Sequence, residues 1–129
     1  MERWLGAHAE RIYALLRFVA GILFACHGAQ KLFGAFGMPA MTSNPMMLVA
    51  GIIEFGGGLL IALGLFASWA ALFASGQMAV AYFMVHAKGG FWPIVNKGEL
   101  AVVYCFLFLY VAAKGSGPYS VDGAMRRHK

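Results

Sequence analysis

The sequence predicts an all-α integral membrane protein, a single domain spanning 1–129 and folded as a four-helix transmembrane bundle. Hydrophobic residues make up 61% of the chain and charged residues 12%. The mean hydropathy is +0.72, and the apolar share exceeds that of soluble globular chains. Its length suits one domain on the usual scale of about 100 to 200 residues. Short breaker segments separate the four apolar runs, and the expected helices are about 12–33, 46–66, 69–87 and 97–113.

The first of these helices carries basic residues toward both ends of an apolar run. Helical spacing places Arg17, Gly21, Phe24, Gly28 and Lys31 along one stripe. At about 1.5 Å rise per residue, Arg17 and Lys31 lie roughly 21 Å apart, so one cation falls near each end of a span. We expect Arg17 to have a structural role and to extend its long side chain to the membrane interface.

The outer end of the same helix carries the segment HGAQK, with His27, Gln30 and Lys31 within five residues. Ionisable groups at membrane depth are costly, and they usually face a bundle interior or a wet cavity. This segment is therefore the first candidate functional site.

The second helix contains Glu54 as its only charged residue. Gly51, Glu54, Gly58 and Ala62 share a face at helical spacing, and small residues on such a face allow close helix packing. We therefore expect Glu54 to point into the bundle, within hydrogen-bonding reach of His27 or Lys31.

The third helix carries Gln77 near its middle and His86 near its outer end. Ala70, Ala74 and Ala81 lie on the same face as Gln77. The expected role of Gln77 is structural, as an interhelical hydrogen-bonding residue.

The fourth helix is short, because 100–113 supplies only fourteen uncharged residues. A span of about 20 residues would draw Glu99 toward the hydrocarbon boundary. Gly115, Gly117 and Pro118 end this helix, and a polar, basic tail follows.

Basic residues divide unequally between the two ends of a four-helix bundle. The side rich in Lys and Arg is normally cytoplasmic, so we expect both termini there. Seven basic residues fall on the side of the termini and three on the other: Arg3, Arg11, Arg17, Lys114, Arg126, Arg127 and Lys129 against Lys31, Lys88 and Lys97.

Ionisable residues from all four helices are expected at one depth. His27 lies about 9 Å below the outer end of the first helix, and Glu54 about 12 Å below the outer start of the second. His86 and Glu99 fall at the outer ends of the other two. Together they predict one ligand-binding cluster in the outer half of the bundle, consisting of His27, Gln30, Lys31, Glu54, His86 and Glu99.

Such a cluster suits three functions. It can bind the polar head of a quinone-like amphiphile, whose carbonyl oxygens accept from His and Lys while Glu and His exchange protons. It can conduct protons or a small solute as a permease. It can also only fix the packing of a structural membrane scaffold. His and carboxylate ligands suit zinc or iron, but no HxxH or ExxH spacing supports a metal site.

The sequence resembles the DoxX family of small four-helix bacterial membrane proteins. The matching features follow the chain from end to end: Arg17, His27-Gly28 with Gln30-Lys31-Leu32-Phe33, Ile53 to Gly58 as IEFGGG with Ala62 to Leu65, His86 to Phe91, Gly98-Glu99, and the tail from Gly115 to Asp122. The resemblance implies a link to quinone-coupled sulfur oxidation and to membrane-associated redox complexes. It assigns no catalytic residues.

The leading prediction is a multi-pass protein of the bacterial inner (cytoplasmic) membrane that binds a quinone-like amphiphile as a subunit of a redox complex. The sequence contains no cofactor motif, so enzymatic activity is left open and an accessory role to a quinone-linked oxidoreductase is suggested. The expected partners are the lipid bilayer and redox-complex subunits, with homo-oligomers also open. Scattered basic residues argue against nucleic acid. Cys26 and Cys105 are read as small buried hydrophobes, with a disulfide as the less favoured alternative.

Overall fold

The computed structural model describes residues 1–37 and 39–127, with the backbone alone at residue 96, and the elements in this part of the chain are all helical. Three helical stretches are long and apolar enough to cross a membrane: Ala9–Phe33, Pro45–Leu63 and Ala67–Gly89. A fourth long helix, α7 (Glu99–Lys114), has 16 residues, which is short of the roughly 20 that a span needs. The all-α membrane class is therefore confirmed.

The helix boundaries lie close to those expected, and left-handed residues set most of the differences. The helix α2 (Ala9–Phe33) is terminated by its C-cap residue Gly34, which has φ 68°. Glycine adopts this left-handed conformation without strain at helix C-termini. The second span ends at Leu63, three residues earlier than expected, because Gly64 is left-handed with φ 71°. The fourth helix starts at Glu99 instead of residue 97, since Lys97 has φ 62°.

Two of the three long stretches are interrupted by π-helical turns. The second consists of α3 (Pro45–Ile52), the π turn η2 (Ile53–Gly57) and α4 (Gly58–Leu63). The third consists of α5 (Ala67–Ala81), the π turn η3 (Tyr82–His86) and η4 (Ala87–Gly89). Glu54 lies in η2 and His86 in η3, and π turns inside helices occur frequently at functional sites.

Asn44 starts the second stretch as an N-cap. Its side-chain oxygen accepts from the backbone N–H groups of Met46 at 3.0 Å and Met47 at 3.4 Å. Pro45 occupies the first helical position, where its missing N–H costs nothing. The remaining elements are short: α1 (Glu2–Gly6), η1 (Ala35–Gly37), α6 (Pro93–Asn96) and α8 (Val121–Arg127).

Glycines bring α2 into backbone contact with the second stretch. A Cβ added at Gly28 would lie 2.2 Å from the backbone nitrogen of Phe55, and one added at Gly21 would lie 2.5 Å from that of Ala62. The stripe predicted on the first helix is thus its packing face. A Cβ added at Gly58 would likewise lie 2.6 Å from the backbone nitrogen of Ala25.

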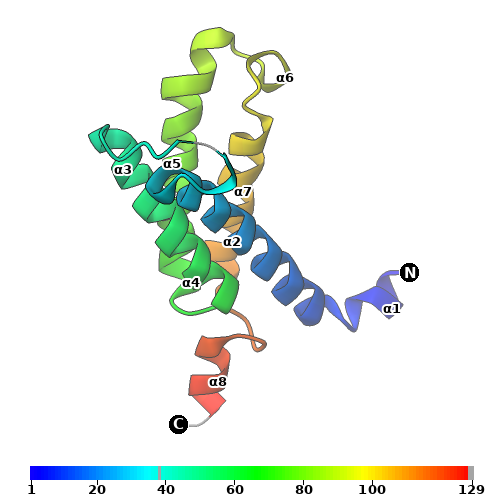
Figure 1. Cartoon of the computed structure of the whole chain (residues 1–129). Helices are drawn as coiled ribbons and strands as arrows, with labels where there is room; N and C mark the ends of the chain where they lie inside the picture. Colours follow the sequence, from blue (N-terminus) through cyan, green and yellow to red (C-terminus); the bar gives the residue numbers. More distant parts are fainter. Residues whose placement is uncertain (38, 128–129) are drawn as a thin grey trace.

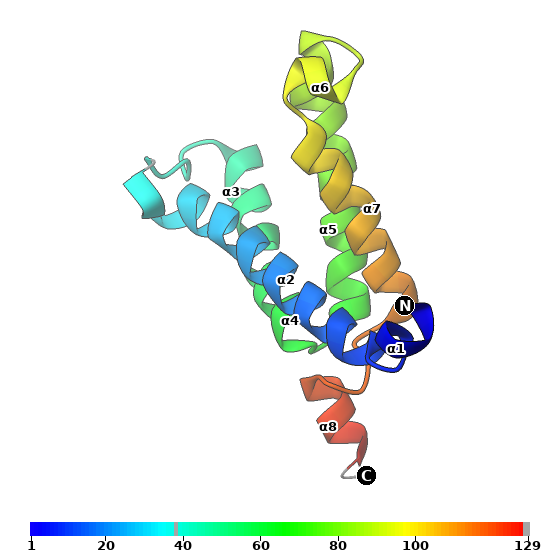
Figure 2. The same ribbon diagram turned by 90° about the vertical axis from the view of Figure 1, so that its right-hand side faces the viewer.

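The helices form two pairs that diverge toward one end. In the first pair α2 packs on α3, η2 and α4, and in the second α5 packs on α7. The pairs meet at the lower end of Figure 2 and separate toward the upper end, where α6 joins α5 to α7. Both termini lie toward the lower, closed end, with α8 below the bundle (Figure 1). The sequence did not predict α8, which belongs to the tail.

Candidate functional site

A buried carboxylate joins three helices at the centre of the site. Glu54 is 1% exposed, its Oε1 accepts from Lys31 Nζ at 2.7 Å, and its Oε2 accepts from Gln77 Nε2 at 2.7 Å. The predicted inward orientation of Glu54 is confirmed, and of the two expected partners, His27 and Lys31, Lys31 makes the contact. The predicted interhelical hydrogen bond of Gln77 is confirmed as well.

Local packing explains why these groups meet. The backbone of Gly28 lies against that of Phe55, the residue after Glu54, so α2 passes close to the π turn. Lys31 lies one turn farther along α2 and reaches the carboxylate from there. The small-residue face of the second stretch, from Gly51 to Ala62, is buried as expected.

The amide of Gln77 is oriented by the carboxylate. Its NH₂ group faces Glu54, and its Oε1 is buried without a hydrogen-bond partner in the described part of the chain. Both Glu54 oxygens accept, which is the bonding pattern of a carboxylate anion. One cation and one amide dipole therefore compensate the buried charge, the usual condition for ionic groups at this depth.

A cavity of about 920 Å³ opens between the two helix pairs next to this ion pair. Most of its wall is apolar and comes from α3, α5 and α7. Five polar side chains that the sequence singled out reach its lining: His27, Lys31, Glu54, Gln77 and His86.

Two residues of the predicted cluster do not line this cavity. Gln30 is half-buried on α2 outside the lining, and Glu99 is exposed in the first turn of α7. A carboxylate at a helix N-terminus is favourable with the helix dipole and water, so Glu99 needs no buried partner. The prediction rested on depth alone. Lys97 and Leu100 line the cavity and Glu99 does not, so Glu99 has the right depth but faces away from the cavity.

Tyr104 is a cavity residue that the sequence analysis missed. It lies on α7 and is 5% exposed. Its ring stacks on Phe108 with centroids 5.2 Å apart and planes at 2°, and it meets His27 edge-on at 6.4 Å. The spacing of Ala101, Tyr104 and Phe108 along one helical face was the available signal, since a hydroxyl in an apolar span requires a partner.

A layer of packed side chains lies between the cavity and Arg17, and Phe24 of this layer lines the cavity. Phe24, Ile61 and Phe108 are fully buried, and the rings of Phe24 and Phe108 are 4.8 Å apart. This apolar layer separates the cavity from the closed end of the bundle, where Arg17 lies.

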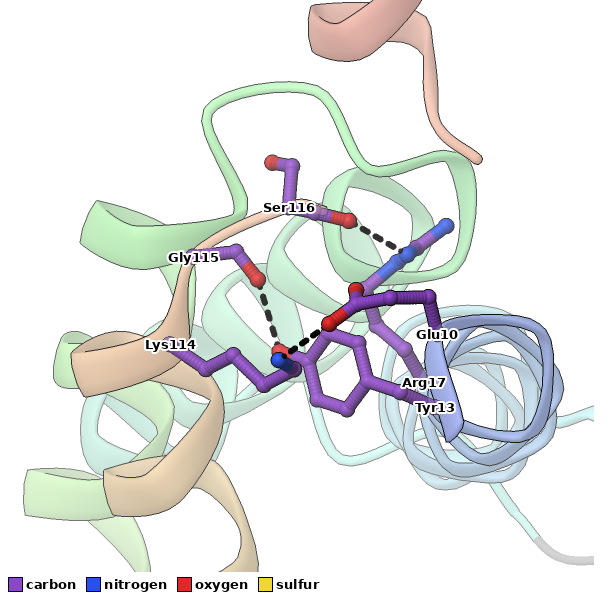
Figure 3. Close-up of polar contacts among 6 residues, drawn as sticks. All are labelled: Glu10, Tyr13, Arg17, Lys114, Gly115 and Ser116. Carbon is purple, nitrogen blue, oxygen red and sulfur yellow. Dashed lines mark hydrogen bonds and ion pairs between the residues drawn. The ribbon is translucent and has the colours of Figure 1, made fainter. Parts of the chain in front are cut away.

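Arg17 is the centre of a second polar cluster, shown in part in Figure 3. It is 3% exposed. Its guanidinium donates to the carbonyl oxygens of Ile61 at 2.9 Å, Ser116 at 2.6 Å and Tyr119 at 3.1 Å. The expectation that Arg17 extends to the membrane interface is wrong, because the C-terminal segment folds back over it and supplies carbonyl acceptors.

Further contacts fasten the end of α7 to the start of α2. Tyr13 donates its hydroxyl to the carbonyl of Gly115 at 2.6 Å, and Lys114 pairs with Glu10 at 2.7 Å (Figure 3). Exposed ion pairs of this kind contribute little stability. The buried tyrosine and arginine bonds therefore carry most of the attachment.

Asp122 at the start of α8 attaches this helix to the bundle. Its carboxylate accepts from the backbone N–H of Phe66 at 2.9 Å and from the Ser116 hydroxyl at 2.7 Å. Its own N–H donates to the carbonyl of Gly64 at 3.0 Å. The turn between the second and third stretches is thus held by the tail.

The two cysteines do not form a disulfide. Cys26 and Cys105 are both free and half-buried, in line with their reading as small hydrophobes. Within the described residues, no three metal-ligating side chains gather into a site.

A comparison with models of protein families identifies the family of this chain. The model of the DoxX family matches residues 12–87, more than half of the chain. The chain belongs to the DoxX family. The matched region supplies Lys31, Glu54 and Gln77, whereas α7 with Tyr104 lies outside it.

Relatives of this DoxX protein extend over most of its length. An uncharacterised protein of Haemophilus influenzae is 42% identical over 116 residues, covering 84% of this chain and 87% of the relative. Inner membrane protein YqjF of Escherichia coli K12 is 28% identical over 128 residues, covering 95% and 94%. No solved structure matches the chain significantly. With its apolar helices, this DoxX protein is a multi-pass inner membrane protein.

Proposed function

We propose that the cavity binds a quinone-like amphiphile, with the polar head near Glu54 and the apolar tail directed toward lipid between the two helix pairs. The observation that carries this proposal is the cavity of about 920 Å³ beside the Lys31–Glu54 pair. Ligand sites of this size typically have apolar walls and a few placed polar groups. The wall and the polar residues of this cavity match that description.

The polar end suits a neutral head that accepts hydrogen bonds. Lys31 has three N–H donors, and the contact with Glu54 leaves some of them available. His27 and His86 add imidazole rings to the lining, whose N–H groups can donate hydrogen bonds. Since Glu54 is paired with Lys31, a neutral head beside this pair meets no unpaired carboxylate. Lys97 also lines the cavity and adds a further N–H donor for a head that accepts hydrogen bonds.

A redox assembly is the setting in which this binding has a use. Quinone redox chemistry belongs to the ligand, and a protein contributes binding, orientation and electrostatics. We therefore propose that the chain is an accessory subunit that holds quinone for a partner oxidoreductase in the same membrane.

The permease alternative is less favoured. A permeation path would have to continue from Gln77 toward Arg17 through polar groups. The layer of Phe24, Ile61 and Phe108 in that direction is fully buried. A buried apolar layer on the way to Arg17 suits a ligand that enters and leaves the cavity by the same side.

The proposed topology has four spans, with α7 as the fourth and both termini in the cytoplasm. Its support is the seven-to-three division of basic residues and the position of both termini toward the closed end. We expect a reporter fused after residue 129, and cysteines placed beyond residue 121, to report the cytoplasmic side. Labelling of those cysteines by an impermeant reagent from the periplasm would contradict this topology.

The binding test uses the purified protein in lipid nanodiscs and a decyl-substituted benzoquinone. We expect Lys31→Met to weaken quinone binding about tenfold, a change of about 1.4 kcal/mol. Glu54→Gln and His27→Ala should weaken it by smaller factors. Glu54→Gln keeps the shape of the side chain while removing its charge. The measurements are ligand titration and thermal unfolding of each variant.

Lys88→Met is the matched control, because Lys88 is exposed and does not line the cavity. A ligand pocket softens the penalty of removing a buried charge partner, because water and relaxed neighbours replace it. A packing cluster would instead show the full cost of roughly 3 to 5 kcal/mol. No quinone binding by the wild type, with large stability losses in all three variants, would leave a structural scaffold.

A further inference from the structure

Three tyrosines are almost fully buried, and they differ in whether their hydroxyl groups make hydrogen bonds within the protein. Tyr13, Tyr82 and Tyr104 are 5%, 8% and 5% exposed. Tyr13 donates to the carbonyl of Gly115 and Tyr82 to that of Phe91. The hydroxyl of Tyr104 has no hydrogen-bond partner among the residues that the structure describes. A buried tyrosine hydroxyl normally finds one, so the partner of Tyr104 is expected outside the chain.

The Tyr104 hydroxyl has room for such a partner. The ring lines the cavity. Its oxygen is not enclosed by protein atoms, unlike the unpartnered Oε1 of Gln77. The hydroxyl therefore opens onto the same cavity as Lys31 and Glu54.

The surroundings of Tyr104 suit a flat ring. Tyr104 stacks parallel to Phe108, and Phe24 meets both rings at centroid distances of 5.5 and 4.8 Å. Phe24 and Phe108 are themselves fully buried, so their rings hold Tyr104 in place. The part of Tyr104 that lines the cavity can meet a flat aromatic or quinonoid group by an edge contact.

We propose that Tyr104 is a positioning residue that donates its hydroxyl hydrogen to a carbonyl oxygen of the ligand and meets the ligand ring with its own edge. This inference rests on the proposed function and deepens it: the ligand head is a flat ring bearing a carbonyl oxygen. It also assigns a role to α7, which contributes neither Lys31, Glu54 nor Gln77.

The test compares Tyr104→Phe with the wild type for two ligands, a decyl-substituted benzoquinone and decylbenzene, which lacks the oxygens. We expect the affinity for the quinone to fall about threefold to tenfold, the range of one hydrogen bond. The affinity for decylbenzene should not change. The melting temperature should also stay unchanged, because Tyr104→Phe removes no hydrogen bond within the protein.

Tyr110→Phe is the control, since Tyr110 lies on the same helix, is 57% exposed and does not line the cavity. Unchanged quinone affinity in Tyr104→Phe, with weakened binding in Lys31→Met, would overturn the role of Tyr104 and leave the proposed function standing; its hydroxyl would then only be hydrated. A large drop in melting temperature would also overturn it. A wild type that binds no quinone would refute the proposed function and this inference together.

Discussion

Gly28→Ala is expected to destabilise the protein by about 3 kcal/mol, at the upper end of the usual cost of overpacking. The added methyl group would lie 2.2 Å from the backbone nitrogen of Phe55 and 2.8 Å from the carbonyl oxygen of Gly51. Backbone atoms cannot move aside as a side chain can, so α2 must separate from η2. This separation should also break the Lys31–Glu54 contact. Thermal unfolding in detergent and quinone titration measure the two effects.

Gly56→Ala is the matched control for this prediction. Gly56 lies in the same π turn, is exposed, and an added Cβ there meets no atom within 4 Å. We expect a change between zero and a slight gain in stability, since alanine is favoured over glycine in helices by up to about 1 kcal/mol. Equal stability of the two variants would contradict the close approach of α2 and η2.

Arg17→Met should cost about 3 kcal/mol and release the C-terminal segment. Methionine keeps the apolar stem but leaves the carbonyl oxygens of Ile61, Ser116 and Tyr119 without their charged donor. Each hydrogen bond to a charged group is worth about 1.5 to 3 kcal/mol. Removing the guanidinium also removes the free-energy cost of burying a cation, and this gain offsets part of the summed loss of the three hydrogen bonds. Thermal unfolding and limited proteolysis after residue 115 measure the loss.

Arg11→Met is the control for Arg17→Met. Arg11 is exposed, and its only hydrogen bonds are long contacts to Tyr119 and His8 among the described residues, so stability should change by less than about 0.5 kcal/mol. A tail in Arg17→Met that resists proteolysis as well as the wild type would refute the role assigned to Arg17. Quinone affinity should be unaffected, because the apolar layer separates Arg17 from the cavity.

Helical periodicity determined which faces of the first three spans turn inward. The stripe that contains Gly21 and Gly28 and the face that contains Glu54 follow from spacings of three and four residues, which any straight helix imposes. The sequence also limited the partner of Glu54 to two residues, because a buried carboxylate in a membrane needs a polar or cationic partner at its own depth. His27 and Lys31 were both open, and the structure selected Lys31.

Only the tertiary structure decided how the helices tilt and which distant segments meet. Tilt and rotation are set by packing between neighbours and not by the length of an apolar run. The divergence of the two pairs therefore creates the cavity and brings Tyr104 to its wall. The contacts of Arg17 join positions 99 and 102 residues apart. No local pattern encodes such pairs, because they depend on where α7 ends and on how the tail folds back over the bundle.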